Sequence, residues 1–480
     1  MKIQLVYSPN DLKYADLRTG YDSYPPPVGL AILSSFLRRY AEIELQIKIY
    51  DGNITELNKI KNNLDGDLIG FSDWFTNHSN SIYLAKEAKR KNPNSIIVFG
   101  GPNASNLGDR ILLNHKEIDF VVYGDGEEAL LGIVNEDLNI PNIWYRSGNQ
   151  VIFSFKKNTQ INKTIPFNFD GLYETDIQKY DTRDKNYNEN IGLTPVPISS
   201  IRGCLKALTI GACSYCAIPR FKRMNILSPK LAWQQIEFLN EKYGIRYFFE
   251  TGDNFLTGAY HKKLLAAKSK DFNIHLRIYS DFDSLSYSDI DILKELGVVE
   301  IFIGLESISS DVLEKANRTS HKNKIIKTIS YLEKNNIRVF LPFLFGLQGE
   351  TLSSIQQNFE FAKHLLNNYG NIQRVLFSLA IPLVGTNWFD ELQSNQSILN
   401  SYLEITGRDL AIDDQLDYEL LVLLSLENYS TITFSDIYNI LKMPISDKIK
   451  KRIAGFGCLE EEVLNLEKEI NTVHYKILVS

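Results

Sequence analysis

Short apolar runs alternate with helix-type patterns over the first part of the chain. Runs rich in β-branched residues, such as "IQLVYS" and "SIIVFGG", are typical of buried strands. Between them lie amphipathic stretches such as "VGLAILSSFLRRY", in which Leu30, Leu33 and Leu37 fall on one helical face. This alternation is typical of an α/β fold, a parallel sheet with helices on both faces. We therefore predict a five-stranded doubly wound (Rossmann-like) domain over residues 1–140.

The alternation stops and later resumes. Residues 141–195 are rich in Asn, Asp and Lys, and this composition predicts a linker. Six further strand and helix units follow over residues 196–390. Because a closed barrel of this type needs eight units, we predict a partial, open (βα)6 barrel whose site lies at the carboxyl ends of its strands. Residues 391–480 predict a mainly helical C-terminal domain that ends in a candidate strand, "VHYKILV".

Composition narrows the class of protein. The 480 residues, 44% of them apolar, can build two or three domains. The net charge of -6 and the lack of long Lys and Arg runs argue against a general nucleic-acid binder, and no apolar stretch approaches the length of a membrane span. Four cysteines cannot form a disulfide framework, and the opening "MKIQLVYS" predicts a strand instead of a signal peptide. We expect a cytoplasmic protein with reduced thiols.

Three of the four cysteines, Cys204, Cys213 and Cys216, lie close together, whereas Cys458 is far away. Thiolates select zinc or iron-sulfur clusters. A structural zinc site needs four ligands, which here would require Cys458 or a distant histidine. Three thiolates on a four-iron cubane would leave one iron open to a substrate or cosubstrate. The segment follows the first predicted barrel strand, where barrel active sites are built, and we therefore favour a [4Fe-4S] cluster.

This segment resembles the cluster loop of the radical S-adenosylmethionine (radical SAM) superfamily. The resemblance rests on the three cysteines, on Tyr215 before the last of them, and on the "AIP" that follows. It implies that S-adenosylmethionine chelates the open iron and is cleaved reductively to a 5′-deoxyadenosyl radical. The superfamily usually spaces its cysteines C-x3-C-x2-C, whereas this chain has C-x8-C-x2-C.

Four further motifs, "ETGDNF", "YSDFD", "GLES" and "FGLQGET", follow successive predicted strands and resemble the cosubstrate-binding motifs of the same superfamily. The resemblance assigns the first to the methionine amino group, the second to its carboxylate or the ribose, the third to the ribose and the fourth to adenine packing. Helix caps would explain the first two motifs equally well. The residues assigned to S-adenosylmethionine are Tyr215, Gly252, Asp253, Asn254, Ser280, Asp281, Glu306, Gly346 and Leu347.

The first domain resembles the cobalamin (B12)-binding domain that precedes the radical SAM barrel in a large subfamily. "DLIGFSDWF", "IIVFGGPNAS" and "FVVYGDGEEAL" carry this likeness, although a related domain can also lose its corrin. The residues assigned to cobalamin are Ser72, Trp74, Gly100, Gly101, Gly124 and Glu127.

The D-x-H-x-x-G element that supplies a histidine to cobalt is missing from this chain. The lower face of the corrin would then be empty, filled by water or covered by a side chain. Trp74, Phe75 and His78 lie on a predicted loop that could cover it, although a loop histidine is more often simply solvated.

Together the two cofactors imply a radical C-methyltransferase that acts on a peptide or natural product and takes electrons from a flavodoxin or ferredoxin. One alternative is a radical peptide epimerase, with Cys458 as hydrogen donor, or another rearrangement without methyl transfer; Cys458 could equally be a buried apolar residue. A corrin or redox sensor without catalysis is the alternative from another class. A methylthiotransferase would need three more cysteines before residue 204, and the sequence contains none there.

Overall fold

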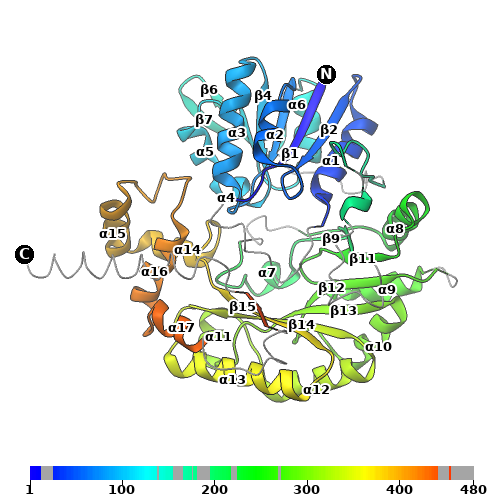
Figure 1. The fold of residues 1–480 in the computed structure, drawn as a ribbon, viewed down its shortest axis with the longest axis vertical. Coiled ribbons are helices and arrows are strands. Elements are labelled where there is room, and N and C mark those ends of the chain that lie inside the picture. Colours follow the sequence, from blue (N-terminus) through cyan, green and yellow to red (C-terminus); the bar gives the residue numbers. More distant parts are fainter. Residues whose placement is uncertain are drawn as a thin grey trace, which may run out of the picture.

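The computed structural model divides into a first domain, a barrel and a group of C-terminal helices (Figure 1). The residues that it describes are 1–11, 25–137, 140–154, 166–175, 177–180, 195–217, 224–268, 272–441 and 453–455. The first domain lies above the barrel in this view, and the C-terminal helices lie to one side of both (Figure 1).

The first domain is built on a seven-stranded sheet with the order β2-β1-β3-β4-β5-β6-β7. Its five parallel strands are β1 (Lys2–Tyr7), β2 (Gln46–Asp51), β3 (Leu68–Ser72), β4 (Ile96–Gly100) and β5 (Phe120–Val122). Its helices are α1 (Val28–Tyr40), α2 (Leu57–Asn63), α3 (His78–Lys91), α4 (Pro102–Leu107), α5 (Asp109–Asn114) and α6 (Glu127–Val134). The predicted doubly wound domain with five parallel strands is confirmed.

The sheet continues into the segment that the sequence predicts as a linker. Strands β6 (Ile143–Ser147) and β7 (Gln150–Ser154) form an antiparallel hairpin at the edge beyond β5. The prediction of five strands is therefore two strands short. The reason is local, since most side chains of the hairpin are only partly buried or exposed, and such strands lack a continuous apolar run.

The second sheet also has seven strands, all parallel, in the order β16-β15-β14-β13-β12-β11-β8. They are β8 (Val196–Ile198), β11 (Tyr247–Glu250), β12 (His275–Asp281), β13 (Val298–Gly304), β14 (Arg338–Phe345), β15 (Ile372–Leu379) and β16 (Ile453–Gly455). The six predicted barrel strands are present in chain order. The C-terminal part of the chain adds a seventh, β16, beside β15.

Helices cover the barrel sheet between successive strands (Figure 1). They are α8 (Pro229–Tyr243), α9 (Tyr260–Ala266), α10 (Tyr287–Leu296), α11 (Ser310–Lys315), α12 (Lys322–Lys334) and α13 (Leu352–Asn368), with short 3-10 turns η3 (Ile177–Tyr180) and η5 (Thr257–Ala259) elsewhere. Helix α10 shows how the sequence sets these bounds. Ser286 and Asp289 form a reciprocal capping box at its start, and Gly297 ends it in the left-handed conformation.

The C-terminal helices are α14 (Asn387–Ser394), α15 (Gln396–Thr406), α16 (Tyr418–Tyr429) and α17 (Phe434–Leu441). The ring of Tyr418 meets Phe75 of the first domain edge to face at 5.6 Å. The backbone N–H of Trp388 donates to the carbonyl oxygen of Ser214, on the cysteine loop, at 3.0 Å, so these helices contact both larger parts of the molecule. The predicted strand "VHYKILV" and Cys458 lie outside the described residues.

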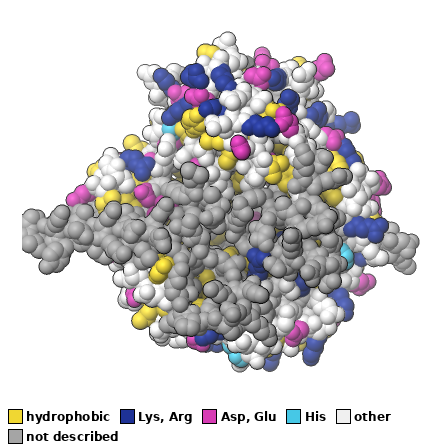
Figure 2. Space-filling view, in the orientation of Figure 1, with side chains coloured by type: hydrophobic (Ala, Val, Ile, Leu, Met, Phe, Trp, Pro, Cys, Tyr) yellow, Lys and Arg dark blue, Asp and Glu magenta, His cyan; other side chains and the backbone are white. Residues whose placement is uncertain are grey.

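The described surface of the first domain carries basic and acidic side chains interspersed (Figure 2). None of the helices in the described ranges has the length and apolar character needed to cross a membrane.

Candidate functional site

The three clustered cysteines lie on the loop that follows β8 and the two-residue strand β9 (Ile201–Arg202), which pairs with β10 (Asn225–Ile226). All three side chains are thiols, each partly buried. Helix α7 (Leu205–Thr209) fills the long gap after Cys204, which caps it. The backbone N–H of Cys216 donates to the carbonyl of Cys213 at 3.0 Å. The additional residues between Cys204 and Cys213 therefore form a short helix of their own.

The donor set fits an iron-sulfur cubane. Within the described residues, no three His, Cys, Asp or Glu side chains converge as the ligands of one metal ion. A cubane does not require such convergence, because each thiolate binds a different iron. Burial raises the pKa of the Cys204 thiol, and the backbone N–H groups of Lys206 and Ala207 partly offset this by donating to its sulfur. Bound metal would deprotonate the thiols in any case.

Glu306 lies beside the cysteine loop. The Tyr215 hydroxyl bonds to its carboxylate, and the guanidinium of Arg318 lies 4.0 Å away. Burial raises the pKa of Glu306, and Arg318 opposes that rise. The backbone of Glu306 is strained, with a φ of 61°, and is held there by two hydrogen bonds to β14. The structure thus brings together two residues, Tyr215 and Glu306, that the sequence assigns to S-adenosylmethionine.

The motif after β11 also touches the cysteine loop. The backbone N–H of Gly203, next to Cys204, donates to Asp253 at 3.0 Å. Burial raises the pKa of Asp253 to about 6. A Cβ on Gly252 would lie 2.7 Å from Ile201, so glycine is needed where the two loops pass. Asp253 and Gly252 are therefore positioned beside the predicted cluster.

Asn254 and Asp281 bond to each other. The Asn254 amide donates to Asp281 at 2.6 Å and to the Ser284 hydroxyl at 3.0 Å. Asp281 also accepts from the backbone and side chain of Ser284, while Ser280 is buried. These contacts are those of a capped turn, the interpretation that the sequence left open beside cosubstrate binding.

Gly346 and Leu347 form the turn after β14. Gly346 has a φ of 86°, and its N–H donates to the buried Glu350 at 2.5 Å. Burial raises the pKa of Glu350 to about 8. Leu347 is 1% exposed and belongs to the apolar core. Its predicted packing against adenine stays a prediction.

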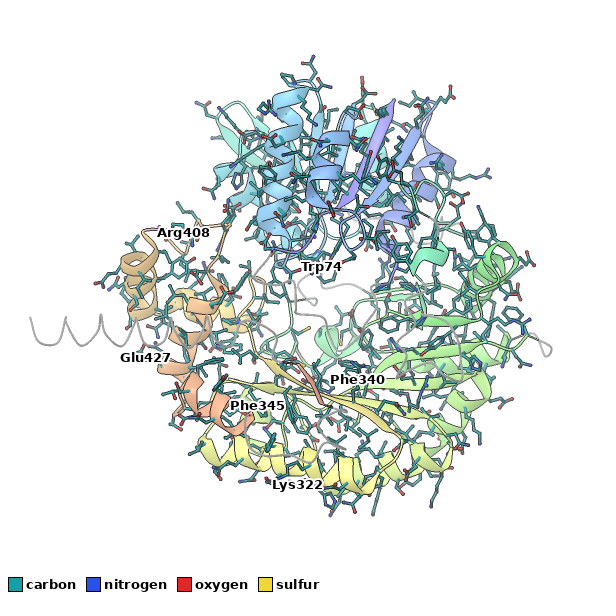
Figure 3. The ribbon with its side chains drawn as sticks, in the orientation of Figure 1. Trp74, Lys322, Phe340, Phe345, Arg408 and Glu427 are labelled. Carbon is teal, nitrogen blue, oxygen red and sulfur yellow. The ribbon has the colours of Figure 1, made fainter. Side chains whose placement is uncertain are left out.

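The residues assigned to cobalamin come together at one edge of the first domain. Ser72 ends β3, Gly100 ends β4, and Trp74 is 44% exposed at the side that faces the barrel (Figure 3). Gly124 has a φ of 79°, and its N–H donates to Ser105 at 3.1 Å. An exposed aromatic ring among small residues at strand ends fits a large flat ligand.

Two of the residues assigned to cobalamin have structural partners. A Cβ on Gly101 would lie 2.8 Å from the carbonyl oxygen of Asp73, which explains the glycine within the domain itself. Glu127 accepts from Arg202 of the barrel at 2.8 Å, and Arg202 also lies 3.2 Å from Asp125. The sequence analysis did not predict a role for Arg202. The only sequence feature that points to it is its positive charge two residues before Cys204.

His78 is not a solvated loop residue, so that interpretation is wrong. It is buried at the start of α3, with Nδ1 2.8 Å from Asp73 and Nε2 3.2 Å from Asp414. His115 lies 2.7 Å from the same Asp414 oxygen. Burial alone would lower the pKa of His78, but the two carboxylates outweigh it and raise the pKa to about 10. Both ring nitrogens are engaged, so His78 positions the loop beside Trp74 instead of covering a corrin.

Comparisons with known proteins agree with this arrangement. The family model "B12 binding domain" matches residues 16–134, and "Radical SAM superfamily" matches residues 198–362. The chain is therefore a radical SAM enzyme with a B12-binding domain in front of its barrel.

Individual relatives cover most of the chain. The "Uncharacterized methyltransferase PH0819" of Pyrococcus horikoshii is 24% identical over 83% of this chain and 84% of its own length. The anaerobic magnesium-protoporphyrin IX monomethyl ester cyclase of Rubrivivax gelatinosus is 21% identical over 91% of this chain and 78% of its own length. The structure of TsrM from Kitasatospora setae, a radical S-adenosylmethionine methyltransferase with cobalamin and a [4Fe-4S] cluster bound, superposes with a TM-score of 0.64 at 17% identity, over 82% of this chain and 74% of that one.

Proposed function

We propose that the chain is a cobalamin-dependent radical C-methyltransferase that acts on a small molecule or a peptide. When bound, a [4Fe-4S] cluster with S-adenosylmethionine supplies an adenosyl radical that removes hydrogen from an unactivated carbon, and methylcobalamin supplies the methyl group. Cys204, Cys213 and Cys216 would hold the cluster. The residues at the strand ends of the first domain would hold the corrin.

One observation carries this proposal: the cysteine loop and the cobalamin edge are joined directly. Arg202, two residues before Cys204, pairs with Glu127 and Asp125 of the first domain. The Asn225 amide, on the strand paired with β9, adds a bond to Asp125 at 2.9 Å. These contacts hold the cysteine loop and the cobalamin edge of the first domain at a fixed separation. A reaction between groups held by two domains requires such positioning.

The protein's own groups have defined tasks in this proposal. Tyr215 and Glu306 would orient the ribose of S-adenosylmethionine by hydrogen bonds, and Asp253 would face its methionine part. Arg318, beside Glu306, places a positive charge near Cys213. Trp74 would present an apolar ring to the corrin and exclude water from that face.

The first test is a comparison of cysteine variants after anaerobic reconstitution. Replacing Cys204, Cys213 and Cys216 with Ala should abolish the cluster absorbance and the formation of 5′-deoxyadenosine under dithionite. Cys458→Ala is the matched control and should keep both. A wild-type protein that carries zinc, or that forms no 5′-deoxyadenosine, would contradict the radical reaction and leave a corrin or redox sensor as the explanation.

The second test separates methyl transfer from rearrangement. The cyclase name of the Rubrivivax gelatinosus relative makes a rearrangement without methyl transfer the second candidate. Protein supplied with cobalamin and with S-adenosylmethionine carrying a labelled methyl group should show a corrin band, and the label should pass to that corrin. A corrin that never takes up the label would favour the rearrangement, and an absent corrin band would rule out the methyltransferase. Cys458→Ala extends this test, since it should abolish an epimerisation and spare a methylation.

A further inference from the structure

Lys206 lies inside the gap between the first two clustered cysteines, on α7. Its Nζ is 3.5 Å from the Cys213 sulfur and donates to the carbonyl oxygen of Asn317 at 2.5 Å. The Asn317 side chain donates back to the carbonyl oxygen of Ala212 at 2.9 Å, next to Cys213. These three contacts hold the Lys206 ammonium next to the Cys213 sulfur. A superfamily loop of the usual length, with three residues in this gap, has no room for this helix.

The charges around the three sulfurs are mixed. Asp253 faces Cys204 and makes its surroundings more negative, while the backbone N–H groups at the start of α7 donate to the same sulfur. Arg318 also interacts electrostatically with Cys213, and its guanidinium lies 4.0 Å from the Glu306 carboxylate. Lys206 is the positive charge that reaches Cys213 within hydrogen-bond distance. Its effect on bound metal should therefore be direct and separable from the effects of the others.

We propose that Lys206 tunes the redox behaviour of the cluster, making its one-electron reduction more favourable. This inference rests on the proposed function, because it requires the cluster at the three cysteines. One electron from an external donor of the flavodoxin or ferredoxin class adds one negative charge to the cluster, and no proton or bond is exchanged. A fixed cation stabilises the more negative state more strongly, and hydrogen bonds to cluster sulfurs act in the same direction.

The experiment is a redox titration of the reconstituted wild type and variants, followed by electron paramagnetic resonance without substrate. In Lys206→Met the ratio of reduced to oxidised cluster at a fixed potential should fall about tenfold, which corresponds to a midpoint about 59 mV lower for one electron. Lys206→Arg should keep most of the wild-type ratio. Lys230→Met, which changes an exposed lysine on α8, should leave it unchanged.

A variant of Asn317 separates charge from loop position. Asn317→Gly removes the bond to Ala212 but keeps the carbonyl that holds Lys206, and glycine suits the φ of 52° at this residue. The midpoint of Asn317→Gly should stay close to that of the wild type. If it falls as far as that of Lys206→Met, or if the midpoint of Lys206→Met equals the wild-type value, the proposal is overturned. A wild type without any cluster signal would instead contradict the proposed function.

Discussion

Arg202 and Glu127 form an ion pair of 2.8 Å that crosses from the barrel to the first domain. Both side chains are mostly buried, and Asp125 shares the guanidinium. The pair joins the strand that precedes the cluster loop to the first residue of α6. It is therefore a direct mechanical link between the two predicted cofactor sites.

Arg202→Met should destabilise the protein by about 2 kcal/mol, because it leaves the carboxylates of Asp125 and Glu127 without their shared cation. Glu127→Gln should cost less, since Asp125 still balances the arginine. A double-mutant cycle by chemical denaturation should give a coupling energy of about 1–3 kcal/mol. Two effects that simply add would show that the ion pair does not hold the domains together.

In Asp414→Asn the free energy of unfolding should fall less steeply with rising pH between pH 6.5 and 10 than in the wild type. The pKa of His78 is raised to about 10 from its ordinary value of 6.5, so its ion pairs contribute fully below pH 6.5 and are lost as the pH rises toward 10. Removing the Asp414 carboxylate should lower the pKa of His78, although Asp73 still raises it. The measurement is the free energy of unfolding between pH 6.5 and 10.

The matched control for this prediction is His364→Gln, an exposed histidine on α13. It should leave the alkaline slope unchanged. Asp414→Asn should also lower stability at pH 7 by about 3 kcal/mol, because two buried histidines lose their shared carboxylate. An Asp414→Asn variant with the wild-type slope would contradict the ion pair with His78.

Between pH 4.5 and 8 the free energy of unfolding should fall less in Glu350→Gln than in the wild type. The folded state raises the pKa of Glu350 from 4.5 to about 8, so it binds a proton more tightly than the unfolded chain does. Stability from this group is therefore full below pH 4.5 and declines as the pH rises through 8. The variant has no such proton, and its stability should decline less over this range.

Because Gln also loses one hydrogen-bond acceptor, the slope with pH is the informative quantity, not the absolute stability. The control is Glu404→Gln, which changes an exposed side chain on α15 and should keep the wild-type slope. If the slope of Glu350→Gln equals that of the control, the carboxyl is not protonated in the folded protein.

Glu306→Gln should weaken the binding of S-adenosylmethionine about tenfold or more, because a hydrogen bond to a charged acceptor contributes about 1.5–3 kcal/mol. Equilibrium dialysis with the reconstituted protein measures this. The iron content should stay at the wild-type level, since Glu306 is not a proposed ligand. Glu314→Gln, an exposed residue on α11, is the control. Unchanged binding in Glu306→Gln would remove this residue from the proposed ribose contact.

The strands of both sheets could be predicted where they are buried on both faces. Phe248 and Ile303, for example, lie in apolar runs that have no exposed partner face. The hairpin of β6 and β7 escaped prediction because it lies at a sheet edge and is partly polar. Strand β16 joins a neighbour far earlier in the chain, and no local pattern encodes that pairing.

The residues of the candidate site also fall into those that could be predicted from local sequence and those that could not. The three clustered cysteines stand out because their chemistry and spacing are both local. Arg202, Lys206 and Asp414 were missed because each gains its meaning from a partner far away in sequence, and a single charged residue on its own is usually a solvated one. Whether the predicted cosubstrate residues bind S-adenosylmethionine stays a prediction.

The carboxylate of Asp414 lies between two histidines of the first domain, His78 and His115, so one residue of the C-terminal part makes two contacts across this boundary. Separating the two parts would break both contacts together. They therefore oppose any movement of the C-terminal helices away from the first domain.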